Sequence, residues 1–200
     1  MRLIGTQTSP YVRKVRVVAA ELGVTDRLGF ETVVMADDTA ALDANPLRKV
    51  PTLITDEGVA IYDSPVIVEW LDAELGGNRL LPTNGPERWI ALTASAAADG
   101  ILDAGSLLRT ERGRPEGTQN GGAIQRQAGK IARVLASLEA DSAWRKRAEP
   151  DLGQLAVGVA VAWLHFRLPE FAPKAADYPG LVAWFETFNT RPSMVSTDPS

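Results

Sequence analysis

The chain has 200 residues, 45% of them apolar, with a formal net charge of −4 at pH 7 and no cysteine. This length suits one compact domain or two smaller ones, and the modest acidic charge argues against a nucleic-acid partner, which requires a basic surface. Without cysteine, a disulfide framework, a thiol nucleophile, a redox dithiol and a thiolate metal site are excluded. No apolar leader opens the chain and no uncharged apolar stretch reaches the roughly 20 residues of a membrane span, so we expect a cytoplasmic protein with no membrane partner.

The first part of the chain combines strand patterns with a helical one. Residues 2–5 and 30–35 are short β-prone runs, and between them Val12, Val15 and Ala19 recur at helical spacing. This order predicts a strand, a helix and a second strand parallel to the first. Crossovers of this kind are right-handed in nearly all known proteins.

Two further strands and a helix complete this part of the chain. Residues 51–55 and 59–62 are β-prone and are joined by an Asp-Glu-Gly spacer, which predicts a hairpin and therefore a mixed four-stranded sheet. Ser64 and Pro65 then open a helix as its N-cap and its first-turn proline. We expect this helix to end at residues 76–77, a Gly-Gly pair.

The pattern then changes to helices alone. Residues 80–86 are rich in proline, glycine and asparagine, and the residues after them show helical periodicity with almost no alternation. We therefore predict an α/β domain over residues 1–77, a linker over 78–86 and an all-α domain over 87–200. The helices of the all-α domain are expected at residues 87–109, 123–147, 152–167 and 179–189.

Three short motifs carry a resemblance to a known family. They are residues 8–15 (TSPYVRKV), residues 45–51 (NPLRKVP) and residues 62–65 (YDSP). In this order and spacing they resemble the glutathione-site motifs of bacterial cytosolic glutathione S-transferases. Residues 98–104 (ADGILDA) and 163–167 (WLHFR) are similar to helices of one bacterial subgroup with a serine in its active-site motif, so the resemblance covers nearly the whole chain.

The resemblance implies a thioredoxin-like amino-terminal domain that binds glutathione and an all-helical domain that supplies a pocket for the second substrate. It also implies glutathione as a co-substrate and a homodimer. No cluster of residues has metal-ligand spacing, so we expect no metal ion. The implied reaction is activation of the glutathione thiol for attack on a small, hydrophobic electrophile, as in detoxification.

Ser9 is the predicted catalytic residue. It stands where the first strand gives way to the first helix, so its hydroxyl and the free N–H groups of the helix can face an anion. A thiol with a pKa of about 8.5 needs a depression of about two units to ionise at neutral pH, which is about 2.7 kcal/mol. A hydrogen bond to a charged group supplies roughly 1.5–3 kcal/mol and a helix N-terminus roughly 0.3–1 kcal/mol, so no general base is required. Other interpretations are that Ser9 only caps the helix, or that Thr8, Tyr11 or a backbone N–H is the donor.

The other two motifs suit the remaining parts of glutathione. In thioredoxin-like folds the proline at the place of Pro51 is cis, and a peptide such as glutathione can dock beside Val50 as an added strand. Ser64 and the helix N–H groups can take the γ-glutamyl carboxylate while Asp63 faces the ammonium. Lys49 can pair with the glycyl carboxylate, although an exposed lysine is more often only solvated.

The second-substrate pocket is less clearly marked. The resemblance places Tyr11 both at the glutathione site and in this pocket. Asp99 and Asp103 share one face of a helix, so they either line the pocket or form a structural polar network. Arg109 can reach an acidic second substrate or satisfy carbonyl groups at the helix end. His165 is the single histidine of the chain, and we expect it to serve in packing.

Residues 150–154 (PDLGQ) resemble the capping element of a buried helix in the family. Asp151 and Gln154 stand where serine or threonine and aspartate are usual. A capping box accepts glutamine at its third residue, so we expect the cap to form.

Two other classes of function stay open beside a transferase. One is a module of the same fold that binds or interacts without turnover, since one fold hosts many functions. The other is a glutathione-dependent isomerase, peroxidase or dehalogenase, which uses the same thiolate on a different electrophile. A thioredoxin-like redox enzyme is excluded because attack on a disulfide needs a protein thiolate.

Overall fold

The structure, a computed structural model, describes residues 1–34 and 42–199, which form two compact units. The first unit comprises the described part of residues 1–83 together with the segment that begins at Pro192. The second unit comprises residues 84–191. No helix within the described ranges is long and apolar enough to cross a membrane.

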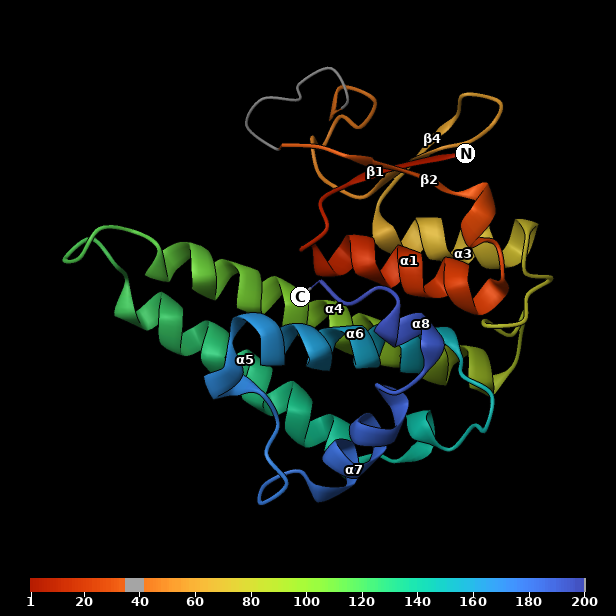
Figure 1. The fold of residues 1–200 in the computed structure, drawn as a ribbon. Helices are drawn as coiled ribbons and strands as arrows, with labels where there is room; N and C mark the ends of the chain where they lie inside the picture. The colour runs from red at the N-terminus through yellow and green to blue at the C-terminus, as the bar shows by residue number, and fades with distance from the viewer. Residues whose placement is uncertain (35–41, 200) are drawn as a thin grey trace. The chain divides into compact units, whose positions relative to one another are not determined.

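The first unit contains four strands, β1 (Arg2–Gly5), β2 (Gly29–Thr32), β3 (Thr52–Ile54) and β4 (Ala60–Ile61). They form one sheet (Figure 1), and its strand order is β2-β1-β3-β4. β1 and β2 are parallel, whereas the other two neighbouring pairs are antiparallel. The predicted mixed, thioredoxin-like sheet is therefore confirmed.

The second strand is shorter than the predicted run over residues 30–35. It ends at Thr32, although the N–H of Val33 still donates to the carbonyl of Gly5 at 3.0 Å. Residue 35 lies outside the described residues.

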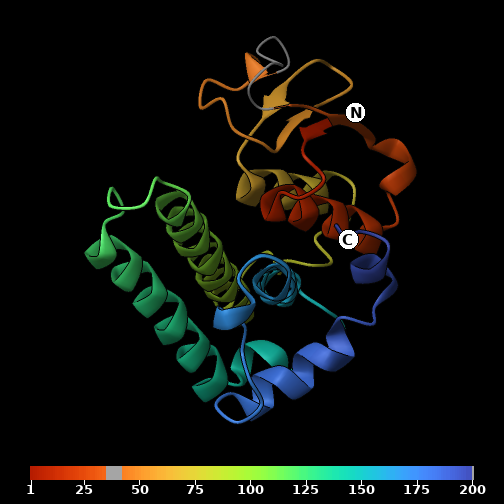
Figure 2. The same cartoon turned by 60° about the vertical axis from the view of Figure 1, so that its left-hand side comes forward.

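Two helices, α1 (Pro10–Leu22) and α3 (Ser64–Glu74), lie side by side against one face of the sheet (Figures 1 and 2). Val12, Val15 and Ala19, the apolar stripe predicted for the first helix, are buried in this layer. The sequence pattern therefore gives both the helix and its buried face. After α1 the chain passes through a short 3-10 helix, η1 (Thr25–Arg27), into β2.

The carboxylate of Asp72 ties the end of α3 to the segment that follows. Asp72 is buried, and its two oxygens accept from the N–H groups of Leu80 and Leu81 at 2.9 and 2.8 Å. The predicted glycine pair follows the helix, and a Cβ on Gly76 would lie 2.7 Å from Asp72 Oδ1 and 2.5 Å from Leu22. Close packing therefore requires glycine at this position.

The second unit consists of the helices α4 (Pro86–Arg112), α5 (Gly121–Ala140), α6 (Leu152–Arg167) and α7 (Pro179–Phe188), with the short 3-10 helices η2 (Ala143–Arg145) and η3 (Pro169–Phe171). The central helix α6 is buried from Leu152 to Leu164 and packs along α4, beside which Figure 2 views it nearly end-on. Glycines permit this close packing. A Cβ on Gly153 would lie 2.6 Å from the carbonyl oxygen of Ala91.

The start of α6 has the expected capping box. Asp151 Oδ1 accepts from the N–H of Gln154 at 2.9 Å, and Gln154 Oε1 accepts from the N–H of Asp151 at 3.1 Å. Glutamine thus closes the box, because two helix-start donors are satisfied reciprocally.

The helix predicted over residues 123–147 ends earlier, at Ala140. Asp141 has an extended backbone, with φ −95° and ψ 109°, and its Oδ1 accepts from the N–H of Ala143 at 2.8 Å. This local hydrogen bond competes with a further helical turn, so the prediction was wrong for its last residues.

The segment after α7 also differs from the expectation. A four-residue helix, α8 (Pro192–Val195), belongs to the first unit, whereas the sequence pattern assigned all residues from 87 onward to the helical domain. α8 packs against α1, and the buried guanidinium of Arg13 on α1 donates to the carbonyl of Met194 at 3.0 Å. This hydrogen bond ties the segment to the first unit.

Candidate functional site

The register of the sheet brings three chain segments to one edge. Ile4 of β1 pairs with Thr52 of β3, and Leu53 of β3 pairs with Ile61 of β4. The end of β1, the start of β3 and the end of β4 therefore lie at the same edge. The three motifs found in the sequence adjoin these points, because one follows β1, one precedes β3 and one follows β4.

Ser9 is the N-cap of α1 at this edge. Its backbone is extended, with φ −74° and ψ 123°, and its Oγ accepts from the N–H of Val12 at 3.4 Å. The N–H groups of the first helical turn have no acceptor within the helix, so this end is suited to an anion. Of the other candidate donors, Thr8 is exposed and Tyr11 is half-buried.

A buried amide holds the loop in front of β3. Asn45 is 1% exposed, and its Nδ2 donates to the carbonyl of Lys49 at 3.0 Å and to the hydroxyl of Thr52 at 3.1 Å. Its Oδ1 accepts from the N–H of Leu47 at 2.9 Å. The sequence reasoning did not select Asn45, although an Asn-Pro pair is a turn signal that marks this loop.

Lys49, Val50 and Pro51 lie on this loop and stay predicted glutathione contacts. The Val50–Pro51 peptide bond is cis, as the resemblance implies. The side chain of Lys49 is exposed, that of Val50 is half-buried and that of Pro51 is buried. The carbonyl of Lys49 accepts from Asn45 and Thr52, and these hydrogen bonds hold the loop backbone in place. The cationic side chain of Lys49 is exposed to solvent.

α3 begins at the same edge. Its first residue lies one position earlier than the predicted N-cap implies. Asp63 is the N-cap and Ser64 is the first helical residue, so the assignment of Ser64 as the cap is wrong by one position. Within the described structure the exposed carboxylate of Asp63 makes no capping hydrogen bond to α3. The hydroxyl of Ser64 is buried in the first turn. The Tyr62–Asp63 peptide bond is also cis.

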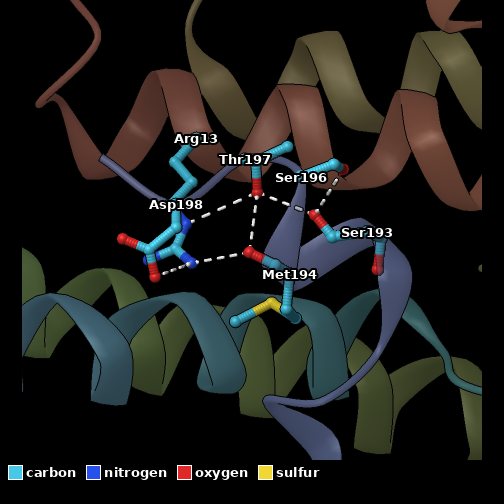
Figure 3. A network of polar contacts seen from close by, with 6 residues as sticks. All are labelled: Arg13, Ser193, Met194, Ser196, Thr197 and Asp198. Carbon is cyan, nitrogen blue, oxygen red and sulfur yellow. Dashed lines mark hydrogen bonds and ion pairs between the residues drawn. The ribbon is translucent and has the colours of Figure 1, made fainter. Parts of the chain in front are cut away.

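The segment around α8 holds α1 one turn beyond Ser9 (Figure 3). Arg13 is 3% exposed, its Nη2 donates to the carbonyl of Met194 at 3.0 Å, and its Nε donates to the hydroxyl of Thr197 at 3.5 Å. The same Nη2 lies 3.6 Å from a carboxylate oxygen of Asp198. Burial lowers the pKa of the Arg13 guanidinium, and the negative charge of Asp198 opposes this shift. This network fixes the helix whose start carries the predicted catalytic residue.

The predicted second-substrate residues are divided between the units. Asp99, Asp103 and Arg109 lie on α4, whereas Tyr11 lies on α1. Asp99 is half-buried, and the side chains of Asp103 and Arg109 are exposed. Their assignment to a substrate pocket stays a prediction.

The single histidine packs against an aromatic ring. His165 stacks on Phe185 with ring centroids 5.5 Å apart and an interplanar angle of 10°. Burial lowers the pKa of His165, which favours the neutral ring. Among the residues that the structure describes, no group of three or more acidic or histidine side chains could hold a metal ion.

A mixed four-stranded sheet with two helix starts at one edge, joined to a helical unit, defines a thioredoxin-like protein with an all-α second unit. Comparison with known proteins agrees with this class. The family described as "Glutathione S-transferase, N-terminal domain" matches residues 8–74. The uncharacterized GST-like protein YibF of Escherichia coli K12 is 36% identical over 202 residues, covering 100% of this chain and 98% of that protein.

Two solved structures are similar over their whole length. A glutathione transferase family member from Pseudomonas fluorescens Pf-5 with bound glutathione is 38% identical, with a TM-score of 0.92 over 100% of this chain and 98% of that one. A structure from the same organism with bound S-(propanoic acid)-glutathione is 36% identical, with a TM-score of 0.89 over 100% of both chains. The chain belongs to the glutathione S-transferase family.

Proposed function

We propose that the protein is a glutathione transferase that activates the thiol of glutathione for attack on a small, hydrophobic electrophile. The observation that carries the proposal is the meeting of two helix starts and one anchored loop at a single sheet edge. The start of α1 suits the thiolate, the start of α3 suits the γ-glutamyl carboxylate, and the loop offers a cation for the glycyl carboxylate. Support also comes from the relatives that hold glutathione or a glutathione thioether.

In this proposal Ser9 donates its hydroxyl hydrogen to the glutathione sulfur. The Oγ of Ser9 accepts from the N–H of Val12 through a lone pair, so helix capping leaves the hydroxyl hydrogen available. The capping and catalytic interpretations of this serine are therefore compatible. Ser9 acts as a hydrogen-bond donor and forms no covalent intermediate.

The test is a titration of bound glutathione, followed by the ultraviolet absorbance of the thiolate. Ser9→Ala should raise the pKa of the bound thiol by about one to two units, because a hydrogen bond to a charged group is lost. Turnover at neutral pH with a chloronitrobenzene electrophile should fall, while glutathione affinity changes by a few fold at most. Thr8→Ala is the matched control and should change neither quantity. An unchanged thiol pKa in Ser9→Ala would show that another group is the donor.

Isothermal titration separates this proposal from a module without glutathione chemistry. We expect glutathione to bind with a dissociation constant in the micromolar to millimolar range. Absence of heat at saturating glutathione, together with no turnover, would favour the non-catalytic module instead.

The finer expectations are part of the same proposal. The resemblance supports a homodimer, a small electrophilic second substrate, a role in detoxification and a cytoplasmic location. Light scattering at micromolar concentration should give twice the mass of one chain, and the mass of a single chain would contradict the dimer. Activity toward a panel of halides, hydroperoxides and isomerisable substrates distinguishes conjugation from the alternative glutathione-dependent reactions.

A further inference from the structure

Two asparagine–glycine pairs, Asn84–Gly85 and Asn120–Gly121, stand directly at the starts of helices. Gly85 is the N-cap of α4, and Asn120 is the N-cap of α5. An asparagine before glycine is susceptible to deamidation, because glycine has no Cβ to hinder attack of its backbone nitrogen on the side-chain amide. All four residues are exposed, so access to water does not distinguish the two pairs.

Hydrogen bonds hold Asn120 in place. Its Oδ1 accepts from the N–H of Ala123 at 3.0 Å, and its carbonyl accepts from the N–H of Ile124 at 3.0 Å. Its own N–H donates to Oε1 of Glu111 at 2.7 Å. Attack on this side chain requires Cγ to turn toward the nitrogen of Gly121, and this rotation breaks the cap of α5. The fold therefore protects Asn120.

Asn84 has none of these restraints. Within the part of the chain that the structure describes, Asn84 makes no hydrogen bond through its backbone or its side chain, and the N–H of Gly85 donates to no acceptor. Residues 83–87 are all exposed, and Asn84 is the first residue of the second unit. Turning the side chain of Asn84 toward the nitrogen of Gly85 therefore costs no hydrogen bond of the fold.

The conformation of Gly85 keeps this susceptible pair in the chain. Its φ is +82°, in the left-handed region where any residue with a Cβ is strained. The turn into α4 therefore favours glycine, the residue that least hinders deamidation of the asparagine before it. α4 also begins without a side-chain cap, so the amide of Asn84 is not engaged at the helix start.

We propose that Asn84 deamidates spontaneously in the folded protein, whereas Asn120 is protected by its hydrogen bonds. The backbone nitrogen of Gly85 gives up its proton and attacks Cγ of Asn84, so that a new N–C bond closes a cyclic succinimide. The bond from Cγ to the side-chain nitrogen breaks, and ammonia leaves with the proton. Water then opens the ring at either carbonyl and yields aspartate or isoaspartate at this position. Water is the only co-reactant, and nothing is oxidised or reduced.

The modification changes the charge at the start of α4. It replaces a neutral amide with a carboxylate two positions before Pro86, the first residue of the helix. A negative charge is favourable near a helix N-terminus, so the aspartate product is compatible with the folded state. The isoaspartate product continues the chain through its side-chain carbonyl, which lengthens the backbone at the boundary between the two units. A more acidic form of the protein therefore accumulates.

Incubation of the full chain at mildly alkaline pH, followed by peptide mapping with mass spectrometry, tests the proposal. Trypsin places Asn84 in the peptide of residues 80–88 and Asn120 in the peptide of residues 113–126, because the Arg114–Pro115 bond resists cleavage. A sample digested at time zero corrects for deamidation during digestion. In the folded protein Asn84 should react at least about tenfold faster than Asn120, which must first open locally. Ion-exchange chromatography should show a more acidic species that grows in step with the modified 80–88 peptide.

The unfolded chain and two matched variants complete the experiment. In concentrated guanidinium chloride both asparagines lose their folded surroundings, so their rates should agree within a few fold. Asn84→Gln lengthens the side chain by one methylene group, which disfavours ring closure, and it should abolish the acidic species. Asn120→Gln makes the same change at the protected pair and should leave the rate at Asn84 unchanged.

Three results would overturn the proposal. The first is that Asn120 reacts as fast as Asn84 in the folded protein. The second is that Asn84 reacts more than about tenfold slower in the folded than in the unfolded chain, because the fold would then protect this site as well. The third is that the difference between the two sites persists in guanidinium chloride, which would assign it to sequence and not to structure. The wild-type comparisons do not depend on the variants, so a variant that fails to fold leaves the test intact.

Discussion

The side chain of Asn45 is a single buried group on which a whole loop of the candidate site depends. Asn45→Ala removes two donated hydrogen bonds and one accepted one, and leaves the N–H of Leu47 and the carbonyl of Lys49 without these partners. We expect glutathione affinity to fall by roughly tenfold or more, because binding would then have to order the loop, at roughly 0.5–1.5 kcal/mol for each immobilised side chain. Isothermal titration measures this change. Asn84→Ala, at an exposed asparagine, is the control, and equal affinities of the two variants would refute the anchoring role.

The carboxylate of Asp151, which caps α6, is a buried titratable group. Burial raises the pKa of Asp151, although hydrogen bonds from the backbone of Gln154 and Gly153 and the charge of Arg147 oppose the shift. The folded state therefore holds this proton more tightly than the unfolded state. Stability that is present at acid pH is lost as pH rises from the ordinary carboxyl pKa, about 4, through the raised value.

Asp151→Asn should remove this loss, because the amide oxygen can still accept from the N–H of Gln154. We expect the stability of the variant relative to wild type to increase from pH 3.5 to pH 7, as measured by urea unfolding across that range. Asp151→Ala should cost about 1 kcal/mol through loss of the cap. A constant difference between Asp151→Asn and wild type at all pH values would contradict the raised pKa.

The effect of a glycine on the stability of α6 or α4 depends on how closely other atoms pack around it. A Cβ on Gly153 would lie 2.6 Å from the carbonyl oxygen of Ala91 and 2.9 Å from the Cβ of Ala94, and no side-chain rotation can move either atom away. A Cβ on Gly100 of α4 would meet no described heavy atom within 4 Å. The two substitutions to alanine therefore test packing and intrinsic helix preference separately.

Gly153→Ala should destabilise the protein by about 1–3 kcal/mol, because overpacking outweighs a helix preference of about 1 kcal/mol. Gly100→Ala should stabilise it by about 0.5–1 kcal/mol, because nothing opposes the same preference. The midpoints of urea unfolding give both values. If Gly153→Ala also stabilised the protein, the close approach of α6 to α4 would be wrong.

Elements with strong local signals were predictable from the sequence. The helix expected over residues 152–167 has the bounds of α6, because an acidic cap opens it and Pro169 follows it. Ser9 and Pro10 likewise marked the start of α1, and β1 was found at its observed residues. In each case the residues that set the boundary lie within a few positions of it.

Features that depend on distant partners were not predictable. The burial of Arg13 rests on Thr197, which is 184 positions away, and no local pattern encodes that pairing. α5 ends early because the carboxylate of Asp141 accepts from the nearby N–H of Ala143. The sequence is equally compatible with a carboxylate that is only solvated. The candidate site was found as three motifs, but Asn45 was missed because its role appears only when the loop is folded around it.

The return of the chain after α7 makes the helical unit an insertion between two parts of the first unit. Thr197→Val keeps the shape of the side chain but removes the hydroxyl that accepts from Arg13 and donates to the carbonyl of Ser193 at 2.7 Å. We expect a loss of about 1–2 kcal/mol in urea unfolding, because buried partners are left unsatisfied. Ser196→Ala, at an exposed neighbour, should change stability by less than about 0.5 kcal/mol. Equal effects of the two substitutions would show that this network does not stabilise the protein.

The same return sets the order of events during synthesis of the chain. Arg13 is translated 184 residues before Thr197, whose hydroxyl accepts a hydrogen bond from its guanidinium. At translation rates of about 5–20 residues per second, α1 emerges roughly 10 to 40 s before its last partner exists. During that interval the amino-terminal unit carries a cation without its native acceptors, and it can reach its final packing only after the helical unit has been translated. On a ribosome that stalls before the helical unit is translated, the nascent amino-terminal unit should therefore be cleaved by protease more readily than the same unit in the released protein.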